Sequence, residues 1–163
     1  MQPNITTLTE KKLVGKRLSM SVSTDRTPEL WRSFMAQRKE ITQAIGPNLF
    51  NVKLYEHNYF EQFDPNASFE KWAAVEVADF ENVPDGLEVL TLPAGLYAVF
   101  YYQGSNTDYR IYQYIYGEWL PSSKEYELDD RPHFDILGEK YRNNDPSSEE
   151  EIWIPIRLKS LEG

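Results

Sequence analysis

An internal repeat constrains the fold of this chain more than any other feature of its sequence. The stretches DPNASFEKWAAVEV and DPSSEEEIWIPIRL both begin with Asp-Pro and continue with Glu and Trp at matching positions. Glu70 and Trp72 correspond in this way to Glu151 and Trp153 at a spacing of 81 residues, while earlier matches follow a spacing of 80. A repeat of this length indicates two copies of one structural unit.

Each copy has the residue pattern of a strand, a helix and two further strands. Apolar and polar residues alternate in GKRLSMSV and in the corresponding GLYAVFYY, which predicts the first strand of each copy. Thr27 with Pro28, and Thr107 with Asp108, are residue types that begin helices. The remaining strands are predicted from NVKLYE and KWAAVEV in the first copy, and from HFDIL and EIWIPIRL in the second.

The two copies cover about residues 13–80 and 92–158, and the segment 81–93, which contains a Pro-Asp-Gly turn, connects them. A copy of this size with one helix would leave much of its sheet uncovered, so we expect a single domain over residues 1–163. The predicted fold class is α+β. We expect a duplicated β-α-β-β unit with pseudo-two-fold symmetry, a mostly antiparallel sheet, helices on one face and a ligand cleft between the halves.

Alternation along the last predicted strand decides which of its side chains share a face. Its isoleucines all have one parity and should face the helices, which places Glu151 and Trp153 together on the opposite face. The same parity groups Glu70 with Trp72. Folded monomers tend to avoid exposing large apolar groups on a polar surface, so we expect this face to be covered and to enclose an aromatic hollow with at least one carboxylate. The alternative is that Glu151 is a solvated first residue of the strand and that Trp153 packs at a rim.

The second copy carries aromatic residues that the first copy lacks. Tyr112, Tyr116 and Trp119 follow the spacing i, i+4, i+7 on the predicted helix, where the first copy has Arg, Ala and Lys. Tyr97 and Tyr101 likewise stand on the predicted strand at positions that are Arg and Ser in the first copy. These residues predict a ligand pocket mostly within the second copy, or a subunit interface. Core packing is the alternative for Trp119.

Composition excludes several classes of function. The chain has no cysteine and two histidines, His57 and His133, which we interpret as surface or loop residues, so we expect no metal and no other cofactor. A formal net charge of −9 argues against nucleic acid as a partner. No segment has the roughly 20 apolar residues that span a bilayer, and the first residues lack the apolar core of a signal peptide. We therefore expect a cytoplasmic protein without a membrane partner.

The stretches GLYAVFYYQG, IYGEWLPSS, YELDDRPHFDIL and DPSSEEEIWIPI resemble the GyrI-like small-molecule-binding family. This family also provides the effector-binding domain of bacterial multidrug-sensing regulators of the AraC and MerR types. The resemblance implies a duplicated β-α-β-β fold with a buried pocket glutamate at Glu151, which the regulators use to hold cationic, lipophilic drugs. It also implies aromatic walls at Trp153, Trp119 and Tyr97. Because only about a dozen residues precede the first predicted strand, we expect no helix-turn-helix and no direct role in transcription.

Three functions are consistent with these features. The first is a stand-alone protein that binds aromatic or cationic lipophilic compounds, with these predicted ligand contacts: Glu151, Trp153, Trp119, Tyr97, Tyr101, Tyr112, Tyr116 and Trp72. The second is hydrolysis of electrophilic, cyclopropane-containing toxins, which the resemblance to some stand-alone members implies, with Glu151 as the general base. The third is an acidic interaction module that docks on a protein partner such as gyrase or a separate regulator.

Overall fold

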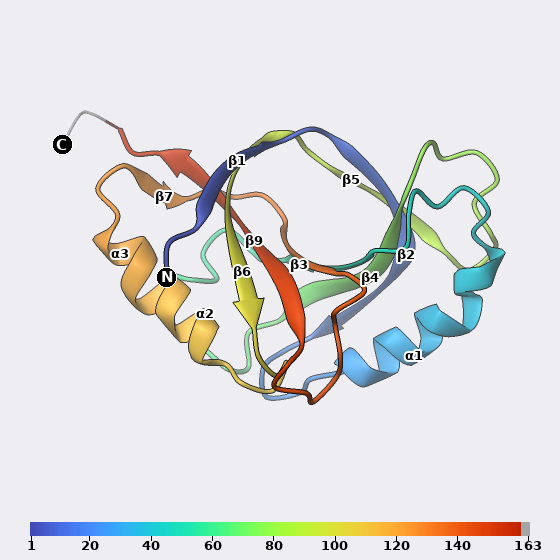
Figure 1. Ribbon diagram of the computed structural model, residues 1–163, viewed down its shortest axis with the longest axis horizontal. Helices are drawn as coiled ribbons and strands as arrows, with labels where there is room; N and C mark the ends of the chain where they lie inside the picture. Colours follow the sequence, from blue (N-terminus) through green and yellow to red (C-terminus); the bar gives the residue numbers. More distant parts are fainter. Residues whose placement is uncertain (161–163) are drawn as a thin grey trace.

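The computed structural model describes residues 1–160 and consists of one large antiparallel sheet with the helices on one side of it (Figure 1). The strands are β1 (Asn4–Leu8), β2 (Lys11–Met20), β3 (Leu49–Leu54), β4 (Phe69–Val77), β5 (Glu88–Leu92), β6 (Gly95–Gln103), β7 (Tyr126–Leu128), β8 (His133–Leu137) and β9 (Glu149–Leu158). The helices are α1 (Thr27–Gln37), the 3₁₀ helix η1 (Arg38–Glu40), α2 (Arg110–Tyr114), the π-helical η2 (Ile115–Trp119) and α3 (Leu120–Ser122). None of the helices in this range has the length and hydrophobicity needed to cross a bilayer.

The strand order reflects the sequence repeat. It runs β1-β6-β9-β8-β3-β4-β2-β5, with β7 paired to β9, and every pairing is antiparallel. The two copies meet where β3 pairs with β8, and the corresponding strands β4 and β9, then β2 and β6, follow outwards on each side. This symmetric α+β arrangement confirms the fold class predicted from the repeat.

Three strands were missing from the prediction: the short β7, which pairs with β9, and the two edge strands β1 and β5. The strand β1 precedes β2 in the chain but pairs with β6, and β5 precedes β6 but pairs with β2. Each copy therefore supplies an edge strand to the other half of the sheet. The strand β5 lies within the segment that the sequence analysis interpreted only as a connection.

Both helical segments cover the same face of the sheet, which we call the helical face (Figure 1). Cross-strand pairing places one row of side chains on this face: Ala73, Asn51, Asp135, Ile152 and Phe100. The helix α1 packs over the β4 end of the row, and the segment α2–η2–α3 packs over the β9 and β6 end. The middle of the row, on β3 and β8, lies between the two helical segments.

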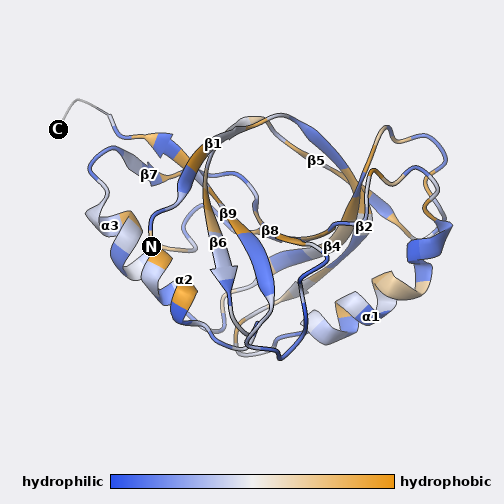
Figure 2. Cartoon of the chain, viewed as in Figure 1, coloured by the Kyte–Doolittle hydropathy of each residue, from blue (hydrophilic) through white to orange (hydrophobic). Residues whose placement is uncertain are grey.

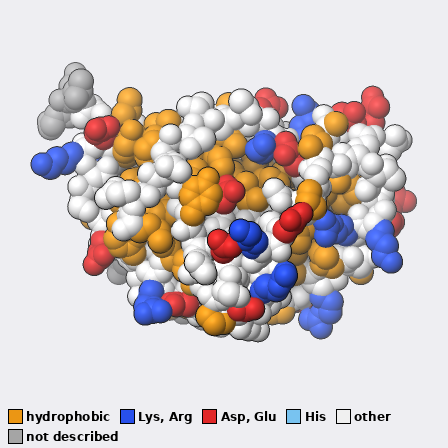
Figure 3. Space-filling model, viewed as in Figure 1, with side chains coloured by type: hydrophobic (Ala, Val, Ile, Leu, Met, Phe, Trp, Pro, Cys, Tyr) orange, Lys and Arg blue, Asp and Glu red, His pale blue; other side chains and the backbone are white. Residues whose placement is uncertain are grey.

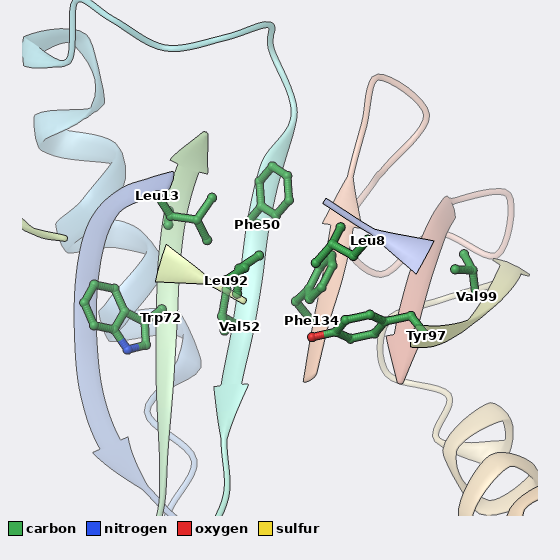
Figure 4. Packing of buried hydrophobic residues seen from close by; sticks show 10 residues of the cluster. Leu8, Leu13, Phe50, Val52, Trp72, Leu92, Tyr97, Val99 and Phe134 are labelled. Atoms are coloured by element: carbon green, nitrogen blue, oxygen red, sulfur yellow. The ribbon is translucent and has the colours of Figure 1, made fainter. Parts of the chain in front are cut away.

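The opposite face, which we call the core face, is closed over by β1 and β5 (Figure 1). Its buried side chains come from both copies, and Trp72 and Tyr97 lie in one apolar cluster with exposed fractions of 3% and 0% (Figure 4). Hydrophobic residues follow the strands, while the connecting loops are mostly hydrophilic (Figure 2). Burying one such aromatic side chain stabilises the fold by about 4–6 kcal/mol, from roughly 150–250 Å² of surface at about 25 cal/mol per Å².

Local hydrogen bonds fix where the helices begin. The helix α1 begins at Thr27, with Arg26 rather than the predicted Thr27 at the N-cap, and Pro28 lies in its first turn, where a missing N–H leaves no intrahelical bond unmade. The Thr27 amide donates to Asp25 Oδ1 at 2.9 Å. In the second copy the Arg110 amide donates to Asp108 Oδ1 at 3.1 Å, so α2 begins later than the sequence predicted.

Candidate functional site

Polar side chains interrupt the apolar helical face at its centre, between the two helical segments. Asn51 and Lys53 come from β3, His133 and Asp135 from β8, and Glu150 from the start of β9. Lys53, His133 and Asp135 are each less than 9% exposed. Because burial of a polar group without a partner costs free energy, the partners of these groups decide what the site can do.

Asp135 is the centre of a hydrogen-bond network that joins the two helical segments. Its Oδ2 accepts bonds of 3.0 Å from Lys53 Nζ and 3.0 Å from Asn51 Nδ2, and the Tyr112 hydroxyl lies 3.4 Å away. Asn51 Oδ1 in turn accepts a bond of 3.3 Å from the Trp31 indole of α1. The Asp135 charge is thus compensated within the protein.

Glu150 lies on the same face but is not compensated. Within residues 1–160 the Glu150 carboxyl group accepts no hydrogen bond and forms no ion pair. Burial raises the pKa of Glu150 to about 7, the nearby Asp135 charge adds to this effect, and Lys53 opposes it. Glu150 is therefore a partly buried carboxyl group whose ionised form has no hydrogen-bond or ion-pair partner within the described residues.

Glu150 lines a hollow of about 630 Å³ at the end of β6, β8 and β9. Small-molecule sites have volumes of roughly 300–1,000 Å³. The register places Glu150 and Tyr102 of this lining on the helical face, and Glu151 and Tyr101 on the core face. The hollow thus gives access to the strand ends on both sides of the sheet.

An aromatic cluster covers the other end of the polar centre. The Tyr116 hydroxyl lies 2.8 Å from His133 Nδ1, so the two rings are joined by a hydrogen bond. The Phe60 ring stacks on Tyr116, with centroids 4.8 Å apart and planes at 18°, and on His133 at 5.3 Å and 22°. Tyr55 meets the His133 ring edge-on at 4.8 Å.

His133 corrects a prediction. It was interpreted as a surface or loop residue, but it lies in a central strand with 3% of its surface exposed. Burial, together with the positive charge of Lys53, holds the pKa of His133 well below its usual value, so the ring is neutral at physiological pH. His57 is exposed, as predicted.

The structure confirms that Glu151 and Trp153 share the core face. The Trp153 indole donates to Glu151 Oε1 at 3.0 Å, and in the first copy the Trp72 indole donates to Glu70 Oε1 at 2.7 Å. Both copies therefore contain the same pairing of an indole with the carboxylate two residues earlier. Glu70 is also ion-paired with Arg17 at 3.2 Å.

The other predicted contacts on the core face have different surroundings. Tyr97 and Trp72 belong to the buried core, where the Tyr97 hydroxyl donates to the Pro132 carbonyl at 2.7 Å. Trp153 stacks on Phe134, with centroids 5.2 Å apart and planes at 17°. Tyr101 is 60% exposed and lines the hollow beside Glu151.

The three aromatic residues predicted on the second helix do not share one environment. Tyr112 and Tyr116 lie over the polar centre, next to Asp135 and His133 respectively. Trp119 packs edge-on against Phe100 at 5.3 Å and lines a second hollow, of about 590 Å³, near the N-terminus. The structure thus brings Tyr112 and Tyr116 together on one face and Glu151, Trp153 and Tyr101 on the other.

Lys53, Asp135 and Glu150 were not predicted as site residues from the sequence. A signal was present, because these residues stand at the parity of the helical face within otherwise apolar strands. A charged residue at such a position must be paired, or must meet a ligand.

Comparison with known proteins places these observations in a family. The sequence profile of the GyrI-like small molecule binding domain matches residues 1–157. The transcriptional regulator BrlR of Pseudomonas aeruginosa is 27% identical over 146 residues, which make up 88% of this chain and 51% of BrlR. The chain therefore spans about half the length of this relative.

Solved structures share the fold. SAV2435 bound to tetraphenylphosphonium superposes with a TM-score of 0.70 at 17% identity, covering 99% of this chain and 96% of SAV2435. The C-terminal domain of EcmrR gives 0.69 at 12% identity, with 96% and 97% covered. A hydrolase encoded by lin2189 from Listeria innocua gives 0.59 at 10% identity, with 96% and 92% covered. With the profile match over nearly its whole length, the chain belongs to the GyrI-like small molecule binding domain family.

Proposed function

We propose that this protein binds an aromatic organic cation on the helical face, with Glu150 as the anionic partner. The observation that carries the proposal is the unpaired, partly buried carboxyl group of Glu150 in the wall of a hollow. An ionised carboxylate in such surroundings is costly unless a cation compensates it. A positively charged ligand would therefore gain affinity by supplying the missing partner.

The surroundings of Glu150 support a ligand that is aromatic as well as cationic. Aromatic rings border the polar centre, where Tyr112 lies beside Asp135 with Lys53 Nζ 4.9 Å from its ring centroid. SAV2435, which shares the fold, was solved with tetraphenylphosphonium, an aromatic cation. Membership of a small-molecule-binding family agrees with this class of ligand.

Glu150 is a better candidate for this role than Glu151, which the sequence analysis favoured. Glu151 already accepts a hydrogen bond from Trp153, and the first copy repeats that arrangement with Glu70 and Trp72. At the spacing of 81 residues, the counterpart of Glu150 is Phe69, which has no charge. We therefore assign the charge role to Glu150 and a packing role to Glu151.

The two adjacent glutamates provide matched variants for a test. Isothermal titration calorimetry with tetraphenylphosphonium would compare wild type, Glu150→Gln and Glu151→Gln. We expect Glu150→Gln to weaken binding about 10- to 100-fold, because an interaction with a charged group contributes about 1.5–3 kcal/mol. Glu151→Gln should bind within about threefold of wild type, because Glu151, although it lines the same hollow, points to the core face and already has the Trp153 indole as its partner. The opposite pattern would return the role to Glu151, and equal binding by all three proteins would refute the proposal.

Hydrolysis of an electrophilic ligand is a second candidate, because the pKa of Glu150, about 7, suits a general base at neutral pH. The sequence analysis gave this role to Glu151. The test is incubation with a cyclopropane-bearing alkylating compound, with mass spectrometry of the product. Turnover that is lost in Glu150→Gln and kept in Glu151→Gln would support it, and absence of product at high protein concentration would contradict it.

Docking on a basic protein partner has less support. The whole chain carries a net charge of −9, but acidic and basic side chains are interspersed over the face seen in Figure 3. Long-range attraction of a partner is strongest where one sign of charge dominates a surface. Binding of a small molecule remains the function that the site favours.

A further inference from the structure

The Phe60 ring occupies a position that a ligand ring could take. Tyr116 and His133, joined by their hydrogen bond, have centroids 6.0 Å apart and planes at 35°, and we call this pair the aromatic platform. Phe60 lies nearly parallel to both rings of the platform, while Tyr55 and Tyr59 meet its edges at 4.8 and 5.0 Å. Phe60 is nevertheless 36% exposed, so the residue that covers the platform is itself partly accessible to solvent.

Phe60 belongs to a connection whose backbone attachment to the β2–α1 loop lies away from Phe60, where the Ser23 amide donates to the Pro65 carbonyl at 2.8 Å. Residues 55–68 join β3 to β4 without a strand of their own. Around Phe60 the backbone bonds are local turns, from the Tyr59 amide to Glu56 and from the Glu61 amide to Asn58. The imidazole of His57 lies 3.1 Å from Asp130, and both of these side chains are exposed. Ring contacts therefore hold Phe60 in place, and individual ring contacts are weak enough for a ligand to replace.

We infer that the aromatic platform is a subsite for a planar aromatic ring of the ligand, and that Phe60 covers this subsite until the ligand displaces it. The inference rests on the proposed function, because the platform lies on the same face as the carboxylates. His133 and Asp135 are two residues apart on β8, roughly 7 Å along the strand. Tyr112 and Tyr116 are four residues apart on the helix, roughly 6 Å. Glu150 stands one residue beyond the Ile136–Glu151 pair, so it lies about four residues, roughly 13 Å, along the strands from His133. A ligand that uses both groups must therefore be an extended molecule of several fused or linked rings.

The neutral state of the platform suits this role. Burial keeps the His133 ring uncharged and holds the pKa of the Tyr116 hydroxyl well above its ordinary value. A cationic ring system would meet no positive charge from His133 when it stacks there. The ligand class that fits both the aromatic platform and Glu150 is a planar, polycyclic aromatic cation.

Displacement of Phe60 predicts an unusual effect of mutation. If Phe60 competes with the ligand, its removal increases the fraction of protein that is competent to bind. We expect Phe60→Ala to bind proflavine, a planar cation, about 3- to 10-fold more tightly than wild type. Phe60→Leu keeps apolar bulk without a ring, so its affinity for proflavine should lie between those of wild type and Phe60→Ala. Phe63→Ala is the matched control, because Phe63 is in the same connection, is 74% exposed and should leave affinity unchanged.

A second measurement reports displacement in the wild-type protein. Saturating proflavine should speed cleavage by a glutamate-specific protease at Glu56 and Glu61, because the segment around Phe60 would leave the platform. Slower cleavage would mean that the segment closes over the ligand, and this would overturn displacement. Weaker or unchanged proflavine binding by Phe60→Ala would also overturn the inference, while loss of binding in Glu150→Gln would leave the proposed function standing. Absence of proflavine and tetraphenylphosphonium binding in every variant would overturn both.

Discussion

Two neighbouring residues of β9 differ in how closely they match the first copy: Glu151 on the core face has a counterpart of the same type, and Glu150 on the helical face does not. On the core face the indole–carboxylate pairs of Glu70 with Trp72 and of Glu151 with Trp153 have nearly the same geometry. On the helical face the copies diverge, since the counterpart of Glu150 is Phe69. The repeated pair is explained by packing, which both copies need. The position that is not repeated carries the carboxyl group to which the proposed function assigns a ligand cation.

The largest expected effect of a mutation comes from breaking the network on the helical face. Asp135→Asn should lower the free energy of unfolding by about 3–4 kcal/mol, because it leaves the buried Lys53 ammonium without its anion. Urea denaturation measures this loss. The double variant Lys53→Met, Asp135→Leu should recover most of it. A loss below about 1 kcal/mol in Asp135→Asn would show that the pair is not buried in solution.

The next effect is the pH dependence of the protein's stability, to which Glu150 should contribute. Its pKa in the folded protein is raised to about 7, above the ordinary value of 4.5, so the folded state binds more protons than the unfolded state between these values. Wild-type stability should therefore fall as pH rises from 5 to 8, by about 1–2 kcal/mol relative to Glu150→Gln. Urea denaturation of both proteins at each pH measures the difference. Parallel pH profiles would mean that Glu150 is solvated.

Ligand binding should show the same titration with the opposite sign. A cation without an ionisable group, such as tetraphenylphosphonium, prefers the ionised carboxylate, so its affinity for wild type should rise about tenfold between pH 6 and 8. Calorimetry at several pH values measures this rise, and Glu150→Gln should show a flat profile. A wild-type affinity that does not change with pH would show that Glu150 does not contact the ligand.

The smallest effects should come from the repeated pairs on the core face. Glu70→Gln and Glu151→Gln should each lower stability by less than about 1 kcal/mol, because the glutamine oxygen can still accept the indole N–H. Similar values for the two variants, measured by urea denaturation, would support their common packing role. A clearly larger loss for Glu151→Gln would break the symmetry on which the comparison depends.

Local patterns in the sequence were sufficient for the repeated parts of the fold. Alternation along the last strand placed Glu151 and Trp153 on one face, and the copies of β-α-β-β followed from the spacing of residues such as Trp72. The pairing of β1 with β6 and of β5 with β2 was missed, because it joins segments far apart in the chain and leaves no local pattern.

The candidate site was only partly accessible to sequence reasoning. Tyr112 and Tyr116 were found from their helical spacing, since aromatic residues absent from the first copy stand out. Glu150 was missed because its neighbour Glu151 matched the repeat, and the role of pocket carboxylate was therefore given to Glu151. His133 was misplaced because a lone histidine gives no sign of burial until the ring of Tyr116 is known to lie 2.8 Å from it.

The most direct test of the account is a crystal structure with tetraphenylarsonium, an isostere of tetraphenylphosphonium whose arsenic atom can be located by anomalous scattering. The account predicts the arsenic on the helical face, within about 6 Å of the Glu150 carboxylate, the range of direct charge and ring contacts. An arsenic position on the core face beside Glu151 and Trp153, or in the hollow beside Trp119, would contradict it.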